Sequence, residues 1–517
     1  MFQQLPKELL DKIFEFLKDD KVTLYSCLLV NRFWCKISVR FLWRNIWDFK
    51  SDTSSQIIII LIACLPNYSK YLLHKNGIII STLKDTLLDY ASFCEILSIG
   101  NISKMINFYL KEQQSENPDN LNQNENNSNN SNNSNRGYRN NINNRKYKSN
   151  NRNKIQMTLK EDIIIQEILK MFMNKGSLKK LTYCLEDRYS DIKIPYDITL
   201  TRFYGARDCL KDLTELNCTN DVQPKFFYQL SKVCHNIQSL IIRFQSYYSN
   251  NGLKELISSQ NCLKYLSVIQ WCDDRVEWTG IIPSLLKKHS NNITKLHLYG
   301  MYHNTSLSFI TNFINLQELD LYFDNGGVDG KTFMELGNVT FKQLQILSFR
   351  YGFSSEVFIK FLENNGKNLK EFYFYRYDNS ISLAIAKFCL NLKSLFIKIA
   401  RSDKATLKVI LTNCKQLESL KLLCDSLYGS YLKANEVLKI VAKHLPKNFH
   451  ELKLNELYNV SSLLPEELES FFMIWKNRTP LTFIIESSSK VKEENMEVIE
   501  KYKKLGIIKK FENIIKS

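Results

Sequence analysis

Cysteine and histidine are the side chains of this chain whose spacing could support metal binding or nucleophilic catalysis. The sequence has thirteen cysteines and seven histidines. No two cysteines are spaced as C-x-x-C and the histidines are dispersed, whereas structural zinc sites use closely spaced pairs of ligands. The phosphate-binding, dinucleotide-binding, zinc-protease and serine-hydrolase motifs do not occur either. We therefore expect no cofactor, no metal ion and no catalytic residue in this chain.

Three of the cysteines, Cys234, Cys389 and Cys414, stand three residues before a repeated apolar unit of the form L-x-x-L-x-L. At that spacing each thiol is predicted to be a small buried plug. The unit begins at Leu213 and starts for the tenth time at Phe449. Its mean spacing of about 26 residues falls within the 20 to 29 of leucine-rich repeats. Helical patterns such as ANEVLKIVAKHL separate the units, so the chain is predicted to form a solenoid with a parallel sheet inside and helices outside.

Alternation along each strand sends the repeated leucines to the core and the residues between them to the open face of the sheet. This face is rich in aromatic and basic residues, which is the composition of protein-binding hot spots. For any single ring, packing on a neighbouring ring is an equal alternative. The candidate target-binding residues are Tyr265, His297, Tyr299, Tyr322, Arg350, Tyr373, Tyr375, Phe396, Lys398 and Lys421.

Composition and charge indicate three further features. Seventy Lys and Arg against fifty-three Asp and Glu give a net charge of +17, which is compatible with a nucleic-acid or acidic partner. Residues 112–154 are dominated by asparagine and have almost no large apolar side chain, so we predict a disordered insert. The longest apolar run, residues 57–65, is much shorter than the twenty or so residues of a membrane span. It is interpreted as a buried helix.

The N-terminal segment LPKELLDKIFEFL, residues 5–17, has more apolar surface than one core contact requires. On a helix its apolar side chains fill an arc of roughly 160°, whereas a single contact needs a stripe of about 100°. The arc alone leaves open which of these side chains face the core of the module and which face a partner. A second helical pattern, TLYSCLLVNRFWCKISVRFLW, follows the polar break KDDK.

The order and spacing of apolar residues in these two patterns resemble the F-box family. The resemblance implies docking on the Skp adaptor of a cullin-RING ubiquitin ligase, although each matching residue is also a candidate for the module's own core. Joined to the repeats, the module resembles the F-box/leucine-rich-repeat class, in which the repeats hold the protein to be ubiquitinated. With the resemblance in view, we expect Leu10 and Phe14 to face the core, and Leu9 and Ile13 to form the docking edge of the first helix. The residues to which the resemblance assigns adaptor binding are Leu5, Pro6, Leu9, Ile13, Leu28, Val30, Trp34 and Trp43.

The predicted fold class is α/β, with a small all-α F-box module followed by a leucine-rich-repeat solenoid. The expected domains are an F-box at 1–50, a helical connecting segment at 51–111, the Asn-rich insert at 112–154, the solenoid at 155–485 and a C-terminal helical cap at 486–517. The expected function is a non-catalytic substrate-recognition subunit of an SCF-type cullin-RING E3 ubiquitin ligase, in the cytoplasm and/or nucleus. Its expected partners are the Skp adaptor, through it the cullin and RING subunits, and an unidentified target protein, with no membrane. The alternative is a basic repeat scaffold that binds nucleic acid, the less favoured partner, or an acidic partner independently of a ligase.

Overall fold

The computed structural model divides the chain into two compact units. The first comprises residues 1–243 with 248–262, and the second comprises 244–247 with 263–517. Leu5 and residues 116–154 of the expected insert lie outside the described residues. The structure describes residues 6–48, 54–80, 86, 88–115, 157–184, 198–245, 250–270, 278–301, 306–323, 330–350, 354–424, 431–456 and 463–515.

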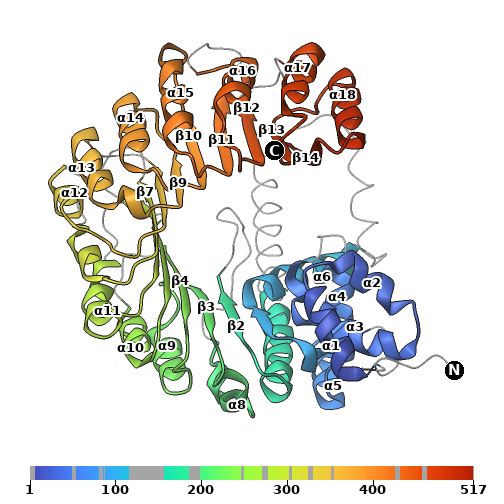
Figure 1. The fold of residues 1–517 in the computed structure, drawn as a ribbon. Coiled ribbons are helices and arrows are strands. Elements are labelled where there is room, and N and C mark those ends of the chain that lie inside the picture. Colours follow the sequence, from blue (N-terminus) through green and yellow to red (C-terminus); the bar gives the residue numbers. More distant parts are fainter. Residues whose placement is uncertain are drawn as a thin grey trace, which may run out of the picture. The chain divides into compact units, whose positions relative to one another are not determined.

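The first unit begins with a three-helix module that consists of α1 (Lys7–Phe16), α2 (Lys21–Leu28) and α3 (Arg32–Arg44) (Figure 1). The second helical pattern of the sequence is therefore two helices. The break is fixed by Asn31, whose side chain accepts a hydrogen bond from the backbone N–H of Trp34 at 2.9 Å and caps α3. Asp20 caps α2 in the same way, accepting from Thr23 N–H at 3.0 Å.

The rest of the first unit combines helices with four parallel strands. Strand β1 pairs with β2, β2 with β3, and β3 with β4. The apolar run at 57–65 is a buried helix as predicted, with Ile58 and Leu61 fully buried. The segment expected to be only helical contains strand β1, so the sheet begins before the first repeat seen in the sequence. The elements are α4 (Ser54–Ala63), α5 (Asn67–Lys75), β1 (Ile96–Ser98), α6 (Ile99–Ser115), a helix over 157–175, β2 (Lys180–Tyr183), α8 (Ala206–Leu210), β3 (Glu215–Thr219), α9 (Pro224–Ser231), β4 (Ser239–Phe244) and α10 (Asn251–Ser259).

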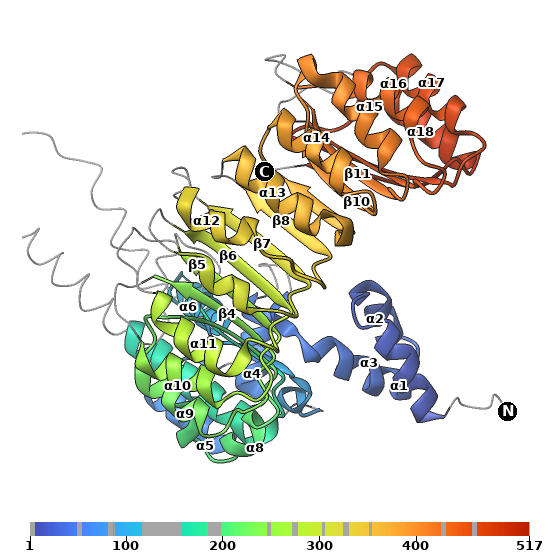
Figure 2. The same ribbon diagram turned by 60° about the vertical axis from the view of Figure 1, so that its left-hand side comes forward.

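The second unit alternates strands with helices, and each strand from β5 to β14 pairs in parallel with the next. The helices cover one face of this sheet (Figure 2). The expected helical cap is instead α18 followed by strand β14. The elements are β5 (Tyr265–Gln270), α11 (Ile282–His289), β6 (Lys295–Met301), β7 (Glu318–Phe323), α12 (Gly330–Gly337), β8 (Ile346–Arg350), α13 (Ser355–Asn365), β9 (Glu371–Phe374), α14 (Asn379–Phe388), β10 (Ser394–Lys398), α15 (Lys404–Asn413), β11 (Ser419–Cys424), α16 (Ala434–His444), β12 (Glu451–Glu456), α17 (Pro465–Trp475), β13 (Leu481–Ser487), α18 (Glu493–Lys504) and β14 (Ile508–Ile515).

The repeated leucines form the core between strands and helices, as predicted. Leu266, Leu296 and Leu319 occupy matching positions on β5, β6 and β7 and are almost completely buried. The repeat cysteines are buried plugs, and burial raises the pKa of the Cys234 and Cys414 thiols to about 12. The chain is thus an N-terminal three-helix module followed by a leucine-rich-repeat solenoid, which confirms the predicted fold class.

Candidate functional site

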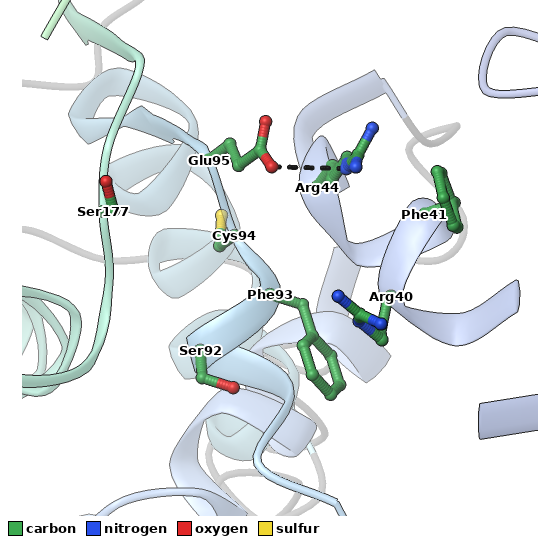
Figure 3. A pocket seen from close by; sticks show the side chains of 8 residues that line it. All are labelled: Arg40, Phe41, Arg44, Ser92, Phe93, Cys94, Glu95 and Ser177. Atoms are coloured by element: carbon green, nitrogen blue, oxygen red, sulfur yellow. Dashed lines mark ion pairs between the residues drawn. The ribbon is translucent and has the colours of Figure 1, made fainter. Parts of the chain in front are cut away.

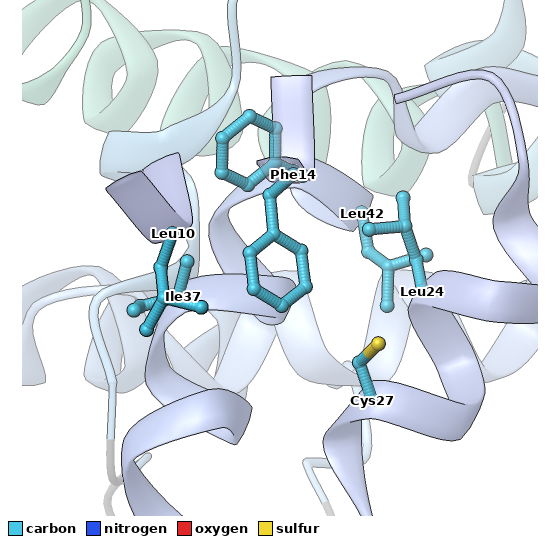
Figure 4. Close-up of a cluster of buried hydrophobic side chains, with 7 residues drawn as sticks. Leu10, Phe14, Leu24, Cys27, Ile37 and Leu42 are labelled. Atoms are coloured by element: carbon cyan, nitrogen blue, oxygen red, sulfur yellow. The ribbon is translucent and has the colours of Figure 1, made fainter. Parts of the chain in front are cut away.

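The three-helix module closes its own core with one side of α1. Leu10 and Phe14 are buried together with Leu24, Cys27, Ile37, Phe41 and Leu42 (Figure 4). The Phe14 ring lies 5.5 Å from the Trp34 ring and 5.8 Å from the Phe41 ring, between centroids. Burial of one such aromatic side chain is worth about 1.5–3 kcal/mol. The prediction that Leu10 and Phe14 belong to the core is therefore confirmed.

The other side of the module exposes large apolar side chains that this core does not use. Of the residues assigned to adaptor binding, Leu9, Ile13 and Val30 are 48%, 42% and 58% exposed, and Pro6 is exposed at the start of α1. Because water disfavours apolar surface, a cluster of this kind on a small module indicates a partner. We call the large exposed apolar side chains of α1, of α2 and of the turn that follows α2 the exposed apolar cluster: Leu9, Ile13, Phe16, Val22, Tyr25, Leu29 and Val30.

Four members of the exposed apolar cluster were not among the predicted site residues: Phe16, Val22, Tyr25 and Leu29. The sequence contains a signal for them, since Phe16 lies on the over-wide apolar arc, Val22 and Tyr25 lie on the short helix α2 and Leu29 follows its last residue. Three residues that were predicted to bind the adaptor are less exposed than this cluster. Leu28, Trp34 and Trp43 are half-buried and pack against the core of the module. Their assignment to the adaptor stays a prediction, and Leu5 is not described.

The C-terminal end of α3 is fixed to the start of the sheet within the first unit. The Arg44 guanidinium pairs with Glu15 of α1 at 2.6 Å and with Glu95, which precedes β1, at 3.3 Å. The Trp47 indole N–H donates to the Ile96 carbonyl at 2.6 Å, and the Trp43 ring lies 4.6 Å from the Tyr90 ring, between centroids. These contacts orient the module relative to β1.

A pocket of about 150 Å³ lies at this junction (Figure 3). Two arginines line it, Arg40 and Arg44, together with Phe41, Phe93 and Cys94 among others. Both guanidinium groups are already paired, Arg40 with Asp11 at 3.7 Å and Arg44 with two glutamates. The pocket therefore offers an anion little charge that is not already compensated.

On the second unit, the positions between the repeated leucines of β5 to β13 form what we call the inner face. At its N-terminal end a hydrogen-bonded chain crosses three strands. His297 on β6 contacts Glu318 on β7 through Nε2 at 2.8 Å, and its Nδ1 lies 3.1 Å from the Tyr265 hydroxyl on β5. Lys295 also pairs with Glu318 at 2.8 Å. The bond from His297, with help from Lys295, lowers the pKa of Glu318 to about 2 against the opposing effect of burial.

A second pair on the inner face links Tyr299 and Asp320. The Tyr299 hydroxyl donates to Asp320 Oδ2 at 2.6 Å, and burial together with this bond raises the Tyr299 pKa above its usual value. The other carboxylate oxygen of Asp320, Oδ1, is buried and accepts no hydrogen bond among the described residues. A buried acceptor without a partner is costly, so it is a place where a bound group could donate.

The centre of the inner face is a stack of rings and cations. The Arg350 guanidinium carbon lies 3.9 Å from the centroid of the Tyr375 ring and 5.6 Å from that of Tyr322. Its Nε is buried and donates no hydrogen bond within the described ranges. Lys398, on the same lane of the sheet, is half-buried, and this burial lowers its pKa. Neither Arg350 nor Lys398 forms an ion pair in the part of the chain that the structure describes, so both cations are uncompensated there.

Phe396 is the exception among the predicted target-binding residues, because its side chain is only 2% exposed. Its ring lies 4.6 Å from the Tyr375 ring, and the Lys421 ammonium lies 5.5 Å from its centroid. Lys421 in turn pairs with Glu486 on β13 at 2.7 Å. Phe396 therefore supports the two side chains above it, and direct target contact by its ring would require those side chains to move.

Tyr373, the last of the predicted target-binding residues, is partly exposed on the inner face. The Tyr373 hydroxyl donates to Glu371 at 2.7 Å, and burial with this bond raises the Tyr373 pKa to about 12. Of the ten predicted residues, the structure thus brings nine to the surface of one continuous face. Their role in holding a target stays a prediction.

The two surfaces define a class of protein: a repeat solenoid that carries a small helical docking module. Residues 2–48 match the family model described as F-box-like, so the N-terminal module is an F-box-like domain. No curated protein matches the chain.

Several solved structures resemble the chain, including the following two. One is a chain of the crystal structure of the Rad7 and Elc1 complex in yeast, with 15% identity over 63% of this chain and 80% of that chain and a TM-score of 0.37. The other is a leucine-rich-repeat protein of Leptospira interrogans, with 16% identity over 65% of this chain and 84% of that one and a TM-score of 0.29.

The described residues contain neither a cluster of metal ligands nor a membrane-spanning helix. No group of three or more His, Cys, Asp or Glu side chains there could hold a metal ion. No helix within the described ranges is long and apolar enough to cross a membrane.

Proposed function

We propose that this chain is the substrate-recognition subunit of an SCF-type cullin-RING ubiquitin ligase, acting in the cytoplasm and/or nucleus. Its F-box-like module docks on the Skp adaptor and its inner face holds the target protein. The chain itself is non-catalytic in this proposal, because ubiquitin is transferred by the subunits that the adaptor recruits. The observation that carries the proposal is the exposed apolar cluster on a module that matches the F-box-like family over residues 2–48.

The geometry of the module supports docking because core and contact residues are separate. Leu10 and Phe14 close the core, whereas Leu9 and Ile13 on the same helix are exposed. Burying two such side chains against an adaptor would contribute several kcal/mol at about 25 cal/mol per Å² of apolar surface. The contacts of Arg44 and Trp47 would then hold the docked module in a fixed orientation to the first strand.

The test is co-purification of the full chain with the Skp adaptor. Leu9→Ala with Ile13→Ala should reduce adaptor recovery at least tenfold, and Leu5→Ala with Pro6→Ala should act in the same direction. The matched control is Tyr68→Ala with Tyr71→Ala, since these side chains on α5 of the same unit are 69% and 63% exposed. All three double variants should melt at the wild-type temperature. Full adaptor recovery by the Leu9/Ile13 variant would contradict the proposal.

The inner face is tested in the same experiment with charge reversal at Arg350, Lys398 and Lys421. Proteins that accumulate on the adaptor-deficient variant should be lost from this triple variant, while adaptor recovery stays unchanged. The control reverses the charge of three exposed lysines elsewhere, so the change in charge is equal. They are Lys225 on α9, Lys232 directly after α9 and Lys287 on α11. Retention of every target by the inner-face variant would place target binding on another surface.

A further inference from the structure

The helix side of the second unit carries a basic groove to which the proposed function gives no role. The groove lies between α15 and α16 and has a volume of about 370 Å³. Lys404 and Lys408 line it from α15, four residues apart and therefore on one face of that helix. Lys439 and Lys443 line it from α16 with the same spacing. All four ammonium groups belong to exposed side chains, so two rows of positive charge flank one groove.

The acidic groups of the groove do not neutralise it. Glu436 is the only carboxylate among the residues that line it, and this carboxylate pairs with Arg401 at 3.3 Å and accepts from the backbone N–H of Lys433. Lys439 has a loose pair with Glu467 at 3.5 Å and is itself 69% exposed. Lys404, Lys408 and Lys443 form no ion pair within the described ranges. The groove therefore has an excess of positive charge beside helices that are otherwise packed into the solenoid.

The lining also indicates which kind of anion would fit. It consists of four lysines, Glu436, His444 and an apolar floor at Ile440, and none of these lining residues is a phenylalanine, tyrosine or tryptophan on which a base could stack. Single-stranded nucleic acid is usually held by such stacking, whereas a duplex presents its phosphates on the outside. Lysine binds phosphate as a hydrated point charge, which suits contacts with a phosphate backbone that do not depend on one fixed geometry.

We infer that the groove between α15 and α16 binds the phosphate backbone of a nucleic-acid duplex without reading its sequence. The site lies on the helix side of the sheet, so it is separate from the inner face and does not depend on the proposed ligase function. Three uncompensated lysines correspond to about three phosphate contacts, and the affinity should then fall about 40-fold when salt rises from about 50 to about 200 mM.

The experiment measures fluorescence anisotropy of a labelled DNA duplex of arbitrary sequence with the full chain. Lys404→Glu with Lys408→Glu and Lys443→Glu should weaken binding at least tenfold and reduce the magnitude of the logarithmic salt slope by about three. The Lys→Arg triple variant should bind like wild type, which separates lost charge from lost folding. The second part of the Asn-rich insert, residues 136–154, carries seven Lys or Arg and no acidic residue. It is present in every variant, so it cannot produce a difference between them.

The control is the charge-matched variant at Lys225, Lys232 and Lys287, which should keep the wild-type affinity and salt slope. Equal weakening by this control would show a general charge effect and overturn the inference. Wild-type binding by the groove variant would overturn it as well. Displacement of the duplex by poly-glutamate at lower charge concentration than by unlabelled duplex would assign the groove to an acidic protein segment instead.

Discussion

Glu318 offers the sharpest quantitative test of the inner face, because its carboxylate is held by two cationic or hydrogen-bonding groups. Contacts with His297 and Lys295 lower its pKa from the usual 4.5 to about 2. A shift of this size corresponds to about 3 kcal/mol at 1.36 kcal/mol per unit. Lys295 is 52% exposed, so solvent screens its share, and we expect Glu318→Gln to cost about 2 kcal/mol at neutral pH.

The sign of the pH dependence follows from the direction of the shift. A carboxyl with a lowered pKa in the folded state stabilises the fold above its unfolded pKa, and this contribution is lost as pH falls through the folded pKa. The difference in free energy of unfolding between wild type and Glu318→Gln should therefore be constant above pH 4.5 and shrink between pH 4.5 and about 2.

The assay is urea unfolding of the two proteins over this pH range, followed by a probe in the second unit. Glu371→Gln is the matched control, since Glu371 occupies the equivalent position on β9 and accepts its bond from the Tyr373 hydroxyl. It should cost less in free energy of unfolding, because the group from which Glu371 accepts this bond is a neutral hydroxyl. A Glu318→Gln difference that does not change down to pH 2, or an equal loss for the control, would refute the assignment of the stabilisation to the His297 and Lys295 contacts.

Two further predictions concern packing. Gly300→Ala should destabilise the second unit by more than about 2 kcal/mol in thermal unfolding. Gly300 has φ 73° at a bulge of β6, and an added Cβ would collide with the Gln270 carbonyl. Gly337→Ala is the control, because Gly337 lies outside the left-handed region. Phe14→Ala should cost about 3–5 kcal/mol in the stability of the module. Phe16→Ala should leave the melting temperature unchanged, because the Phe16 side chain is 91% exposed. Equal losses would contradict the division of α1 into a core side and a contact side.

The features that the sequence predicts correctly depend on local periodicity. The period of two places Leu266 and Leu296 in the core of the sheet, and the period of 3.6 separates Leu10 from Leu9 on α1. Each assignment needs only a few neighbouring residues and the need to bury apolar surface. The spacing of the repeat then fixes the parallel order of the strands, since every unit contacts the next one.

The features that the sequence does not predict depend on partners distant along the chain. Strand β1 has only three residues, Ile96–Ser98, and its partner β2 begins at Lys180. Residues 178–183, LKKLTY, follow the L-x-x-L-x-L pattern with tyrosine as the last apolar residue, whereas β1 does not have leucine at the first and last positions and is identified as a strand by its pairing. Strand β14 at the other end is likewise recognised through its ladder with β13. The sequence pattern therefore predicts a sheet that is shorter at both ends than the one observed.

The inner face shows a different limit, because alternation gives the side to which a residue points and not what covers it. Phe396 points to the predicted side, yet Tyr375 and Lys421 from neighbouring strands bury its ring. Long side chains reach across the spacing of adjacent strands, which a one-strand pattern does not describe.

If the inner face binds a target, as proposed, its internal contacts limit which of its side chains can bond to that target. His297 and Tyr265 are engaged with each other and with Glu318, so a ligand that used them would have to replace existing hydrogen bonds. Arg350 Nε and Asp320 Oδ1 have no hydrogen bond among the described residues, but both atoms are buried. A ligand would reach them only if the side chains that cover them moved, and it would then gain bonds without replacing any. A competitor that lacked either matching group would leave that atom unsatisfied.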